Sequence, residues 1–220
     1  LRDVTEAMTT NESFFFRDTR PFDQFRDLAL PALLERRAKM RRIRIWSAAC
    51  SSGQEPYSLA MLLQEHAAKL QGWNIEILAT DLSTAILDKA REGIYSQFEV
   101  QRGLPITRLV KYFKQIGDRW QVDRSLRDMV TFRPYNLLED LGPLGTFDII
   151  FLRNVLIYFD QPTKTKVLNA IARQIAPDGY LFLGGAETVL GITNRFRVLP
   201  GERGIYARNE GEPEAAVAFG

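Results

Sequence analysis

The chain has 220 residues, 45% of them apolar and 25% charged, with a formal net charge of +2. This balance fits one α/β domain with a full core, and the near-neutral charge argues against a nucleic-acid partner. The single cysteine (Cys50) and single histidine (His66) exclude an internal disulfide and argue against a metal site. We therefore expect no metal, a reducing, cytoplasmic setting and, since every apolar run is short, no membrane insertion.

Helix and strand patterns alternate from the first helical segment onward. Residues 20–42 show helical spacing, interrupted by Pro31, where we expect a kink or a break. A buried strand at 43–49 leads through a turn of small residues into a helix that starts near Pro56. A second strand at 75–80 ends at an aspartate and is followed by another helix. Residues 96–128 are less regular, with a hairpin turn expected at Gly117-Asp118.

Further strands and one helix complete the pattern. The clearest central strand is the almost continuous apolar run at 147–152. The other expected elements are a core strand at 129–132, a helix at 162–175 closed by Pro177-Asp178-Gly179, a strand at 180–183, and a strand pair at 196–199 and 204–207.

This alternation predicts a doubly wound, mostly parallel α/β sheet, a methyltransferase-like variant of the nucleotide-binding (Rossmann-like) fold. We expect seven strands with an antiparallel last strand, since the final pair is joined by a short turn. The expected division is a docked N-terminal linker and helix at 1–42, the main domain at 43–208 with a small β-subdomain inserted at about 111–133, and a disordered tail at 209–220.

Two acidic residues follow strand ends, where such sheets bind ligands. Glu55 stands just after the small-residue turn 48–53. A carboxylate there repels a pyrophosphate but suits a ligand with an ammonium group; alternatively it only complements the helix N-terminus. Asp81 ends the second strand and could accept both hydroxyls of an adenosine ribose. Its alternative is an N-cap role, for which Ser83 is better placed.

Polar residues follow two more strands. Asn136-Leu137 could read an adenine edge and cover its face, or could simply form a turn. Arg153-Asn154, with Tyr158 beyond, follows the central strand, and burying such a pair is costly without partners. Three successive phenylalanines at 14–16 indicate a segment docked on the domain, and Arg17 beside them could clamp a carboxylate.

Taken together, these segments resemble the CheR family of chemotaxis receptor protein-glutamate O-methyltransferases. Order and spacing agree over roughly residues 5–208. The resemblance is carried by Thr10–Arg17, Ser47–Ser58, Ala79-Thr80-Asp81, Asn136-Leu137-Leu138 and Arg153–Asp160.

The resemblance implies S-adenosylmethionine as methyl donor, S-adenosylhomocysteine as product, and glutamate carboxylates on the cytoplasmic helices of chemotaxis receptors as acceptors. It places Glu55 at the methionine ammonium, Asp81 at the ribose, Asn136-Leu137 at the adenine, and Arg17 and Tyr158 nearest the transferred methyl. The full cofactor set that it implies is Asn11, Ser13, Arg17, Glu55, Asp81, Asn136, Leu137, Arg153 and Asn154.

The chain also departs from the family pattern. We expect most of the small N-terminal helical domain associated with receptor recognition to be missing, which keeps open a regulatory module that binds the cofactor without turnover. A methyltransferase for a different substrate is the other alternative. Since the turn at Gly117-Asp118 is short, we expect no need for a tethering pentapeptide at the receptor's C-terminus.

Overall fold

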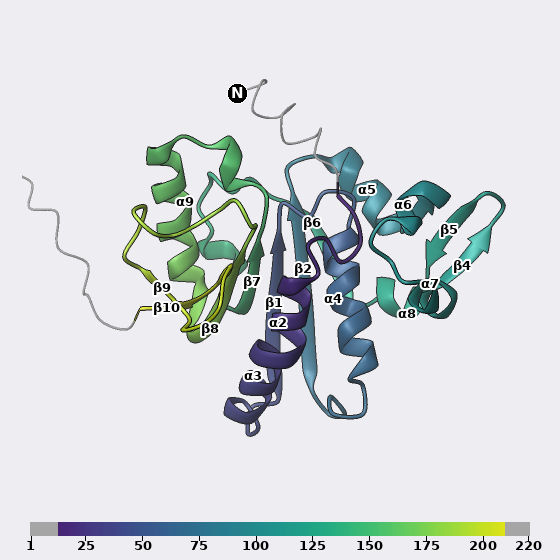
Figure 1. Ribbon diagram of the computed structural model, residues 1–220, viewed down its shortest axis with the longest axis horizontal. Helices are drawn as coiled ribbons and strands as arrows, with labels where there is room; N and C mark the ends of the chain where they lie inside the picture. The colour runs from purple at the N-terminus through teal and green to yellow at the C-terminus, as the bar shows by residue number, and fades with distance from the viewer. Residues whose placement is uncertain (1–12, 210–220) are drawn as a thin grey trace, which may run out of the picture.

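The computed structural model describes residues 13–209, and a seven-stranded sheet runs through its centre (Figure 1). The strand order is β6-β2-β1-β7-β8-β10-β9, with β10 antiparallel to both of its neighbours. This confirms the expected mostly parallel sheet with an antiparallel last strand. The strands are β1 (Arg42–Ala48), β2 (Asn74–Asp81), β6 (Val130–Pro134), β7 (Phe147–Leu152), β8 (Ile175–Leu183), β9 (Phe196–Val198) and β10 (Ile205–Arg208).

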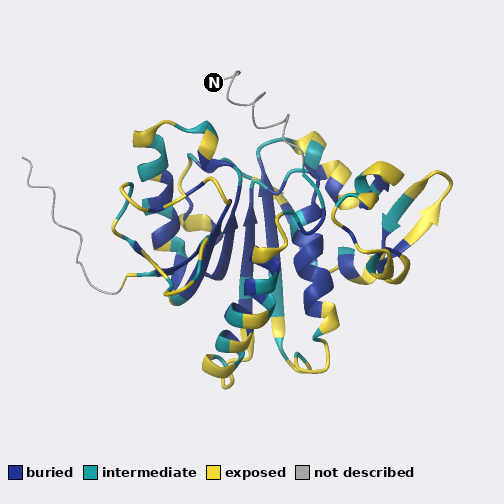
Figure 2. Ribbon diagram, in the orientation of Figure 1, coloured by how far each residue is buried: buried dark blue, intermediate teal, exposed yellow. Residues whose placement is uncertain are grey.

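Both faces of this sheet are buried because helices cover them, and successive side chains of a strand point to opposite faces. In β1, Ile43 and Ile45 belong to one core cluster, and Trp46 and Ala48 to the other. Helix α4 (Gln54–Glu65) packs on the first face. Helix α9 (Gln161–Gln174) packs on the second. The sheet is therefore doubly wound, and Figure 2 shows its central strands as buried along most of their length.

The N-terminal helical segment stays helical through Pro31. It consists of α2 (Arg20–Gln24), a π-helical stretch η1 (Phe25–Ala29) and α3 (Leu30–Arg36). The Leu30 N–H donates to the carbonyl of Phe25, five residues back, directly before the proline that lacks an N–H. The expected irregularity at Pro31 thus takes the form of π-helical hydrogen bonds.

A second, three-stranded sheet lies to one side of the main sheet and is more exposed (Figures 1 and 2). Its order is β3-β5-β4, and the turn between β4 and β5 falls at Gly117-Asp118, as expected. The strands are β3 (Ile94–Ser96), β4 (Phe113–Ile116) and β5 (Arg119–Val122). This sheet starts well before the expected 111, and residues 130–133 belong instead to β6 of the main sheet. The range 111–133 therefore needs correction.

A second correction concerns Pro177-Asp178-Gly179, which lie within β8 and not in a closing turn. The pairing of β7 with β8 shifts register there.

The remaining helices connect these strands at the edges of the two sheets. The connecting helices are α5 (Thr84–Glu92), α6 (Gln97–Gln101), α7 (Ile106–Tyr112), α8 (Arg124–Arg127), and the 3-10 turns η2 (Gly142–Leu144) and η3 (Leu156–Tyr158).

Candidate active site

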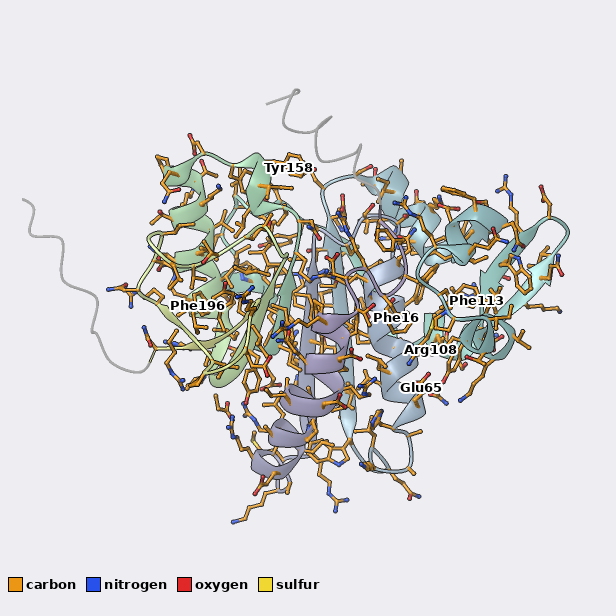
Figure 3. All side chains as sticks on the ribbon, viewed as in Figure 1. Phe16, Glu65, Arg108, Phe113, Tyr158 and Phe196 are labelled. Carbon is orange, nitrogen blue, oxygen red and sulfur yellow. The ribbon has the colours of Figure 1, made fainter. Side chains whose placement is uncertain are left out.

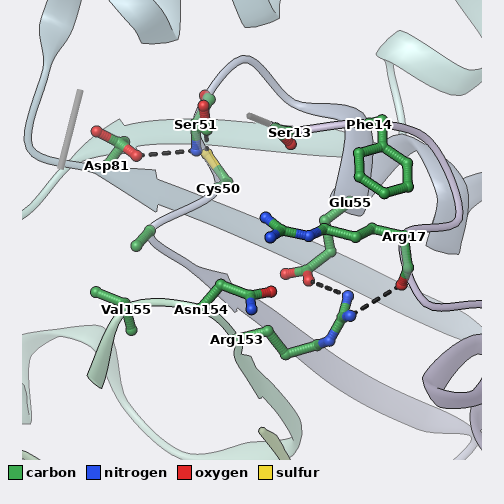
Figure 4. A pocket seen from close by; sticks show the side chains of 11 residues that line it. Ser13, Phe14, Arg17, Cys50, Ser51, Glu55, Asp81, Arg153, Asn154 and Val155 are labelled. Atoms are coloured by element: carbon green, nitrogen blue, oxygen red, sulfur yellow. Dashed lines mark hydrogen bonds and ion pairs between the residues drawn. The ribbon is translucent and has the colours of Figure 1, made fainter. Parts of the chain in front are cut away.

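A pocket lies where β1, β2 and β7 end at the same edge of the main sheet (Figure 4). These three strands are adjacent and parallel, so their carboxyl ends deliver side chains to one place. The N-terminal segment before α2 supplies another wall. The lining residues are Ser13, Phe14, Arg17, Ala49, Cys50, Ser51, Glu55, Asp81, Arg153, Asn154 and Val155.

The turn after β1 brings its backbone close to this pocket. Ala49 and Ser51 adopt left-handed conformations, with φ of 56° and 51°, and Gly53 has φ of 93°. The Cys50 N–H donates to the Thr80 carbonyl at 2.8 Å, which fixes the turn against β2. Non-glycine residues in this region carry strain that the surrounding structure must hold, and such residues cluster at functional sites.

Asp81 faces the pocket from the end of β2 and is only 8% exposed. Its carboxylate accepts the Ser51 N–H at 2.9 Å and the Ser83 N–H at 3.1 Å. Burial raises the pKa of this carboxyl above its ordinary value, despite these hydrogen bonds. The two carboxylate oxygens offer about four acceptor positions, so the carboxylate keeps capacity to accept hydroxyl donors as well. The N-cap of α5 is Ser83, whose Oγ accepts the Ile86 N–H, so capping does not explain Asp81.

Glu55 and Arg153 form a buried ion pair, with 3.1 Å between Oε2 and Nη1 (Figure 4). Ser47 Oγ donates to the other oxygen of Glu55 at 2.7 Å. Nη2 of Arg153 donates to the Arg17 carbonyl at 2.8 Å and to Asp18 at 2.7 Å. Burial raises the pKa of the Glu55 carboxyl, and the charge of Arg153 partly opposes this shift. The pair therefore ties the N-terminal segment to the ends of β1 and β7.

The segment at residues 13–19 docks on the domain through its aromatic side chains. Phe15 is fully buried and meets the rings of Tyr95 and Phe113 edge-on, with centroids 5.0 and 5.3 Å apart. The Phe16 N–H donates to Ser58 Oγ at 3.0 Å. This anchoring places Arg17 over the pocket (Figure 4).

Six of the predicted site residues line this pocket together: Ser13, Arg17, Glu55, Asp81, Arg153 and Asn154. Asn11 lies outside the described residues. Tyr158 ends η3 beyond β7, at the same end of the sheet (Figure 3), but it is not among the lining residues.

Asn136 and Leu137 lie beside the pocket but do not line it. They follow β6, the neighbour of β2, and the Tyr135 N–H donates to the Asp81 carbonyl at 3.0 Å. The Asn136 side chain accepts the Leu138 N–H at 3.0 Å. This hydrogen bond forms a turn, the alternative to an adenine contact that the sequence offers for Asn136. Leu137 is buried, at 6% exposed.

Two acids of the site were not predicted. Asp18 pairs with Arg153, and the only sequence signal for it is its place beside Arg17. Glu187 is buried behind Asn154 and accepts that residue's N–H at 2.8 Å. Its only sequence signal is its place in the loop that follows β8, which ends at Leu183.

Residues 13–209 contain no cluster of three or more histidine, cysteine or acidic side chains able to hold a metal ion. Within the same range, no helix is both long and apolar enough to cross a bilayer.

Comparison with known sequences defines the class. The profile of the family described as "CheR methyltransferase, SAM binding domain" matches residues 11–205. That range contains the main sheet up to the first residue of β10, the small sheet and every lining residue of the pocket. The fold and pocket thus form the S-adenosylmethionine-binding domain of a methyltransferase.

Curated relatives agree over nearly the whole chain. Chemotaxis protein methyltransferase 1 of Vibrio cholerae is 47% identical over 205 residues, covering 92% of this chain and 74% of that protein. Chemotaxis protein methyltransferase 1 of Pseudomonas aeruginosa is 43% identical, with 93% and 76% covered. The chemotaxis protein methyltransferase of Borreliella burgdorferi is 38% identical, with 91% and 72% covered. The chain belongs to the CheR methyltransferase family.

Proposed function

We propose that this chain transfers a methyl group from S-adenosylmethionine to glutamate carboxylates on the cytoplasmic helices of chemotaxis receptors, forming methyl esters. The observation that carries the proposal is the meeting of Asp81, Glu55 and Arg153 in one pocket at the carboxyl ends of β2, β1 and β7. Acceptors of this kind place the chain in the cytoplasm.

Asp81 fits the ribose of the donor. Its carboxylate keeps capacity to accept hydroxyl donors beyond its backbone hydrogen bonds, and such donors would offset the burial that raises its pKa. The left-handed turn at Ala49 and Ser51 leaves small side chains between this carboxylate and Glu55. A nucleoside can therefore lie against the backbone there.

Glu55 and Arg153 fit the amino-acid end of the donor. The carboxylate of Glu55 keeps capacity to accept an ammonium N–H beyond its bonds to Ser47 and Arg153. Arg153 lines the same pocket, and the positive charge of its guanidinium suits the carboxylate of the donor. We assign Asn11, Ser13 and Asn154 to the cofactor site as well, and Asn136-Leu137 to the adenine.

The acceptor needs little acid–base help from the protein. When bound, S-adenosylmethionine supplies a methyl group activated on a sulfonium sulfur, with S-adenosylhomocysteine as the product. A glutamate carboxylate is already ionised near pH 7, so the chain's task is to align it with the methyl. Arg17, above the pocket, and Tyr158, at the same end of the sheet, are proposed to hold that carboxylate. Such positioning can supply about 7–11 kcal/mol of the barrier.

The test is transfer of a labelled methyl group to a receptor cytoplasmic fragment, followed by mild alkali, which releases methanol from a methyl ester. We expect label that is alkali-labile and that disappears when the acceptor glutamates are replaced by alanine. Binding of S-adenosylhomocysteine without any transfer would instead favour a regulatory module. Label that persists in the alanine fragment would indicate a different substrate.

We further propose that no pentapeptide tether is required. β4 and β5 have four residues each and are joined by the two-residue turn Gly117-Asp118, which leaves no long loop to grip a peptide. Removing the receptor's C-terminal pentapeptide should leave the methylation rate unchanged. Saturable binding of the free pentapeptide, with a slower rate on the truncated receptor, would contradict this.

A further inference from the structure

The buried carboxylate of Glu187 joins two loops behind the pocket. Oε2 accepts the N–H groups of Asn154 at 2.8 Å and Gly184 at 2.7 Å. Oε1 accepts those of Val155 at 2.9 Å and Leu156 at 2.7 Å. Four backbone donors from the turns after β7 and β8 therefore converge on one side chain that is 8% exposed.

Three of these donors are consecutive, which requires an unusual backbone. Asn154 is left-handed, with φ of 58°, and this conformation turns the N–H groups of residues 154–156 toward one point. Such a concave run of N–H groups is a typical anion-binding nest. Here the chain's own carboxylate occupies the nest, and so sets the conformation of the segment that carries Arg153 and Tyr158.

Gly184 makes this close approach possible. A Cβ added there would lie 2.8 Å from both Asn154 Nδ2 and Glu187 Oε2. At the next residue, Gly185, an added Cβ would meet nothing within 4 Å. The neighbouring glycines thus provide a test variant and its control: Gly184→Ala disturbs the contact with Glu187, whereas Gly185→Ala does not.

We propose that Glu187 is a positioning residue of the donor site, which holds the 153–158 segment so that Arg153 and Asn154 face the ligand and Tyr158 the acceptor. The proposal rests on the function given above for what the pocket binds. It assigns Glu187 no contact with donor or acceptor. Its effect passes through the backbone that it fixes.

Two measurements on the full chain test the proposal, each with Glu187→Gln, Gly184→Ala and the control Gly185→Ala. Glutamine replaces one carboxylate oxygen with an NH2 group, so two of the four backbone donors lose their acceptor. We expect amide hydrogen exchange in residues 153–158 to rise about tenfold in the first two variants. We expect their Kd for S-adenosylhomocysteine to rise about 10- to 100-fold, since a small displacement of aligned groups is costly.

A purely structural role gives a different result. It would lower the thermal midpoint but leave Kd, and kcat for methyl transfer, at wild-type values at temperatures where circular dichroism shows the variants folded. That outcome, or exchange in 153–158 that matches Gly185→Ala, would overturn the proposal. A positioning role also predicts a raised KM for the donor and, because Tyr158 lies in the same segment, a raised KM for the acceptor. If the wild type itself binds no S-adenosylhomocysteine, the proposed function fails, and hydrogen exchange alone decides the role of Glu187.

Discussion

Each end of the main sheet carries an arginine paired with two acids, but the two clusters differ in what surrounds them. At the amino end, Arg37 contacts Asp148 at 2.7 Å and Asp178 at 2.5 Å, which ties the end of the N-terminal helical segment to β7 and β8. Arg37 is not among the lining residues of the active-site pocket. We interpret this cluster as structural.

At the carboxyl end, Arg153 pairs with Glu55 and Asp18 at the wall of the pocket. Its side chain is 2% exposed, against 16% for Arg37, and burial raises the pKa of its partner Glu55. The same residue types therefore stabilise one end of the sheet and prepare the other to bind a ligand. Position relative to the strand ends, more than residue type, separates the two uses.

The largest expected effect comes from removing each arginine in turn. Arg153→Met leaves Glu55 buried without its cation, and breaking such a pair typically costs about 3–5 kcal/mol. We expect this loss in the free energy of unfolding together with loss of S-adenosylhomocysteine binding. Arg37→Met should lower stability by less and leave binding unchanged. Denaturant unfolding and calorimetry measure the two effects; equal ligand affinity in both variants would remove the distinction between the ends.

A second comparison uses the two ends of one strand, β2. Hydrogen bonds to a charged group contribute about 1.5–3 kcal/mol each, so Asp81→Ala should raise the Kd for S-adenosylhomocysteine by about 100-fold or more. Glu76, near the start of β2, bonds Arg44 at 2.8 Å and lines no part of this pocket. Glu76→Ala should therefore bind like the wild type. A loss of affinity in both variants would indicate general damage to β2.

The pH dependence of binding is expected to be smaller but specific to the carboxyl end. Burial raises the pKa of both Glu55 and Asp81, whereas an ammonium or hydroxyl donor favours their ionised forms. Binding therefore lowers these pKa values and releases protons. Affinity should rise with pH by about tenfold per unit per group below the raised pKa values, and level off above them. Calorimetry from pH 5 to 8 tests this, and an affinity that increases toward acid would contradict it.

The smallest effect is expected from Cys50, a wall residue of the same pocket. The thiol is 2% exposed, and burial raises its pKa well above the ordinary range, so it is a poor nucleophile. We expect Cys50→Ala to keep methyl transfer within about threefold of wild type, as a minor packing change would. Loss of all transfer in a folded Cys50→Ala variant would assign the thiol a chemical role.

Local pattern predicted the parts of the molecule that depend on local physics. Parallel strands that are buried on both faces appear in a sequence as short apolar runs. The apolar runs at 43–49, 75–80 and 147–152 therefore predict β1, β2 and β7 directly. Asp81 and Glu55 followed from them, because topology fixes where strand ends meet. The three-residue strand at Ile94–Ser96 has no periodic pattern, and the small sheet was therefore placed too late in the chain.

The rest depends on contacts between residues far apart in the sequence. Asp18 and Arg153 are separated by 135 positions, and no local signal pairs them. The role of Glu187 depends on the left-handed turn at Asn154 and on a close approach that only Gly184 allows. Neither the ion pair of Asp18 with Arg153 nor the role of Glu187 can be predicted without the three-dimensional structure.

The central claim is that the carboxyl end of the sheet binds the methyl donor. A calorimetric titration of the wild-type chain with S-adenosylhomocysteine tests it most directly, with Asp81→Ala and Glu76→Ala titrated alongside. We predict one saturable site per chain, lost with Asp81→Ala and kept with Glu76→Ala. Unmeasurable binding by the wild type, or equal binding by the two variants, would contradict the account.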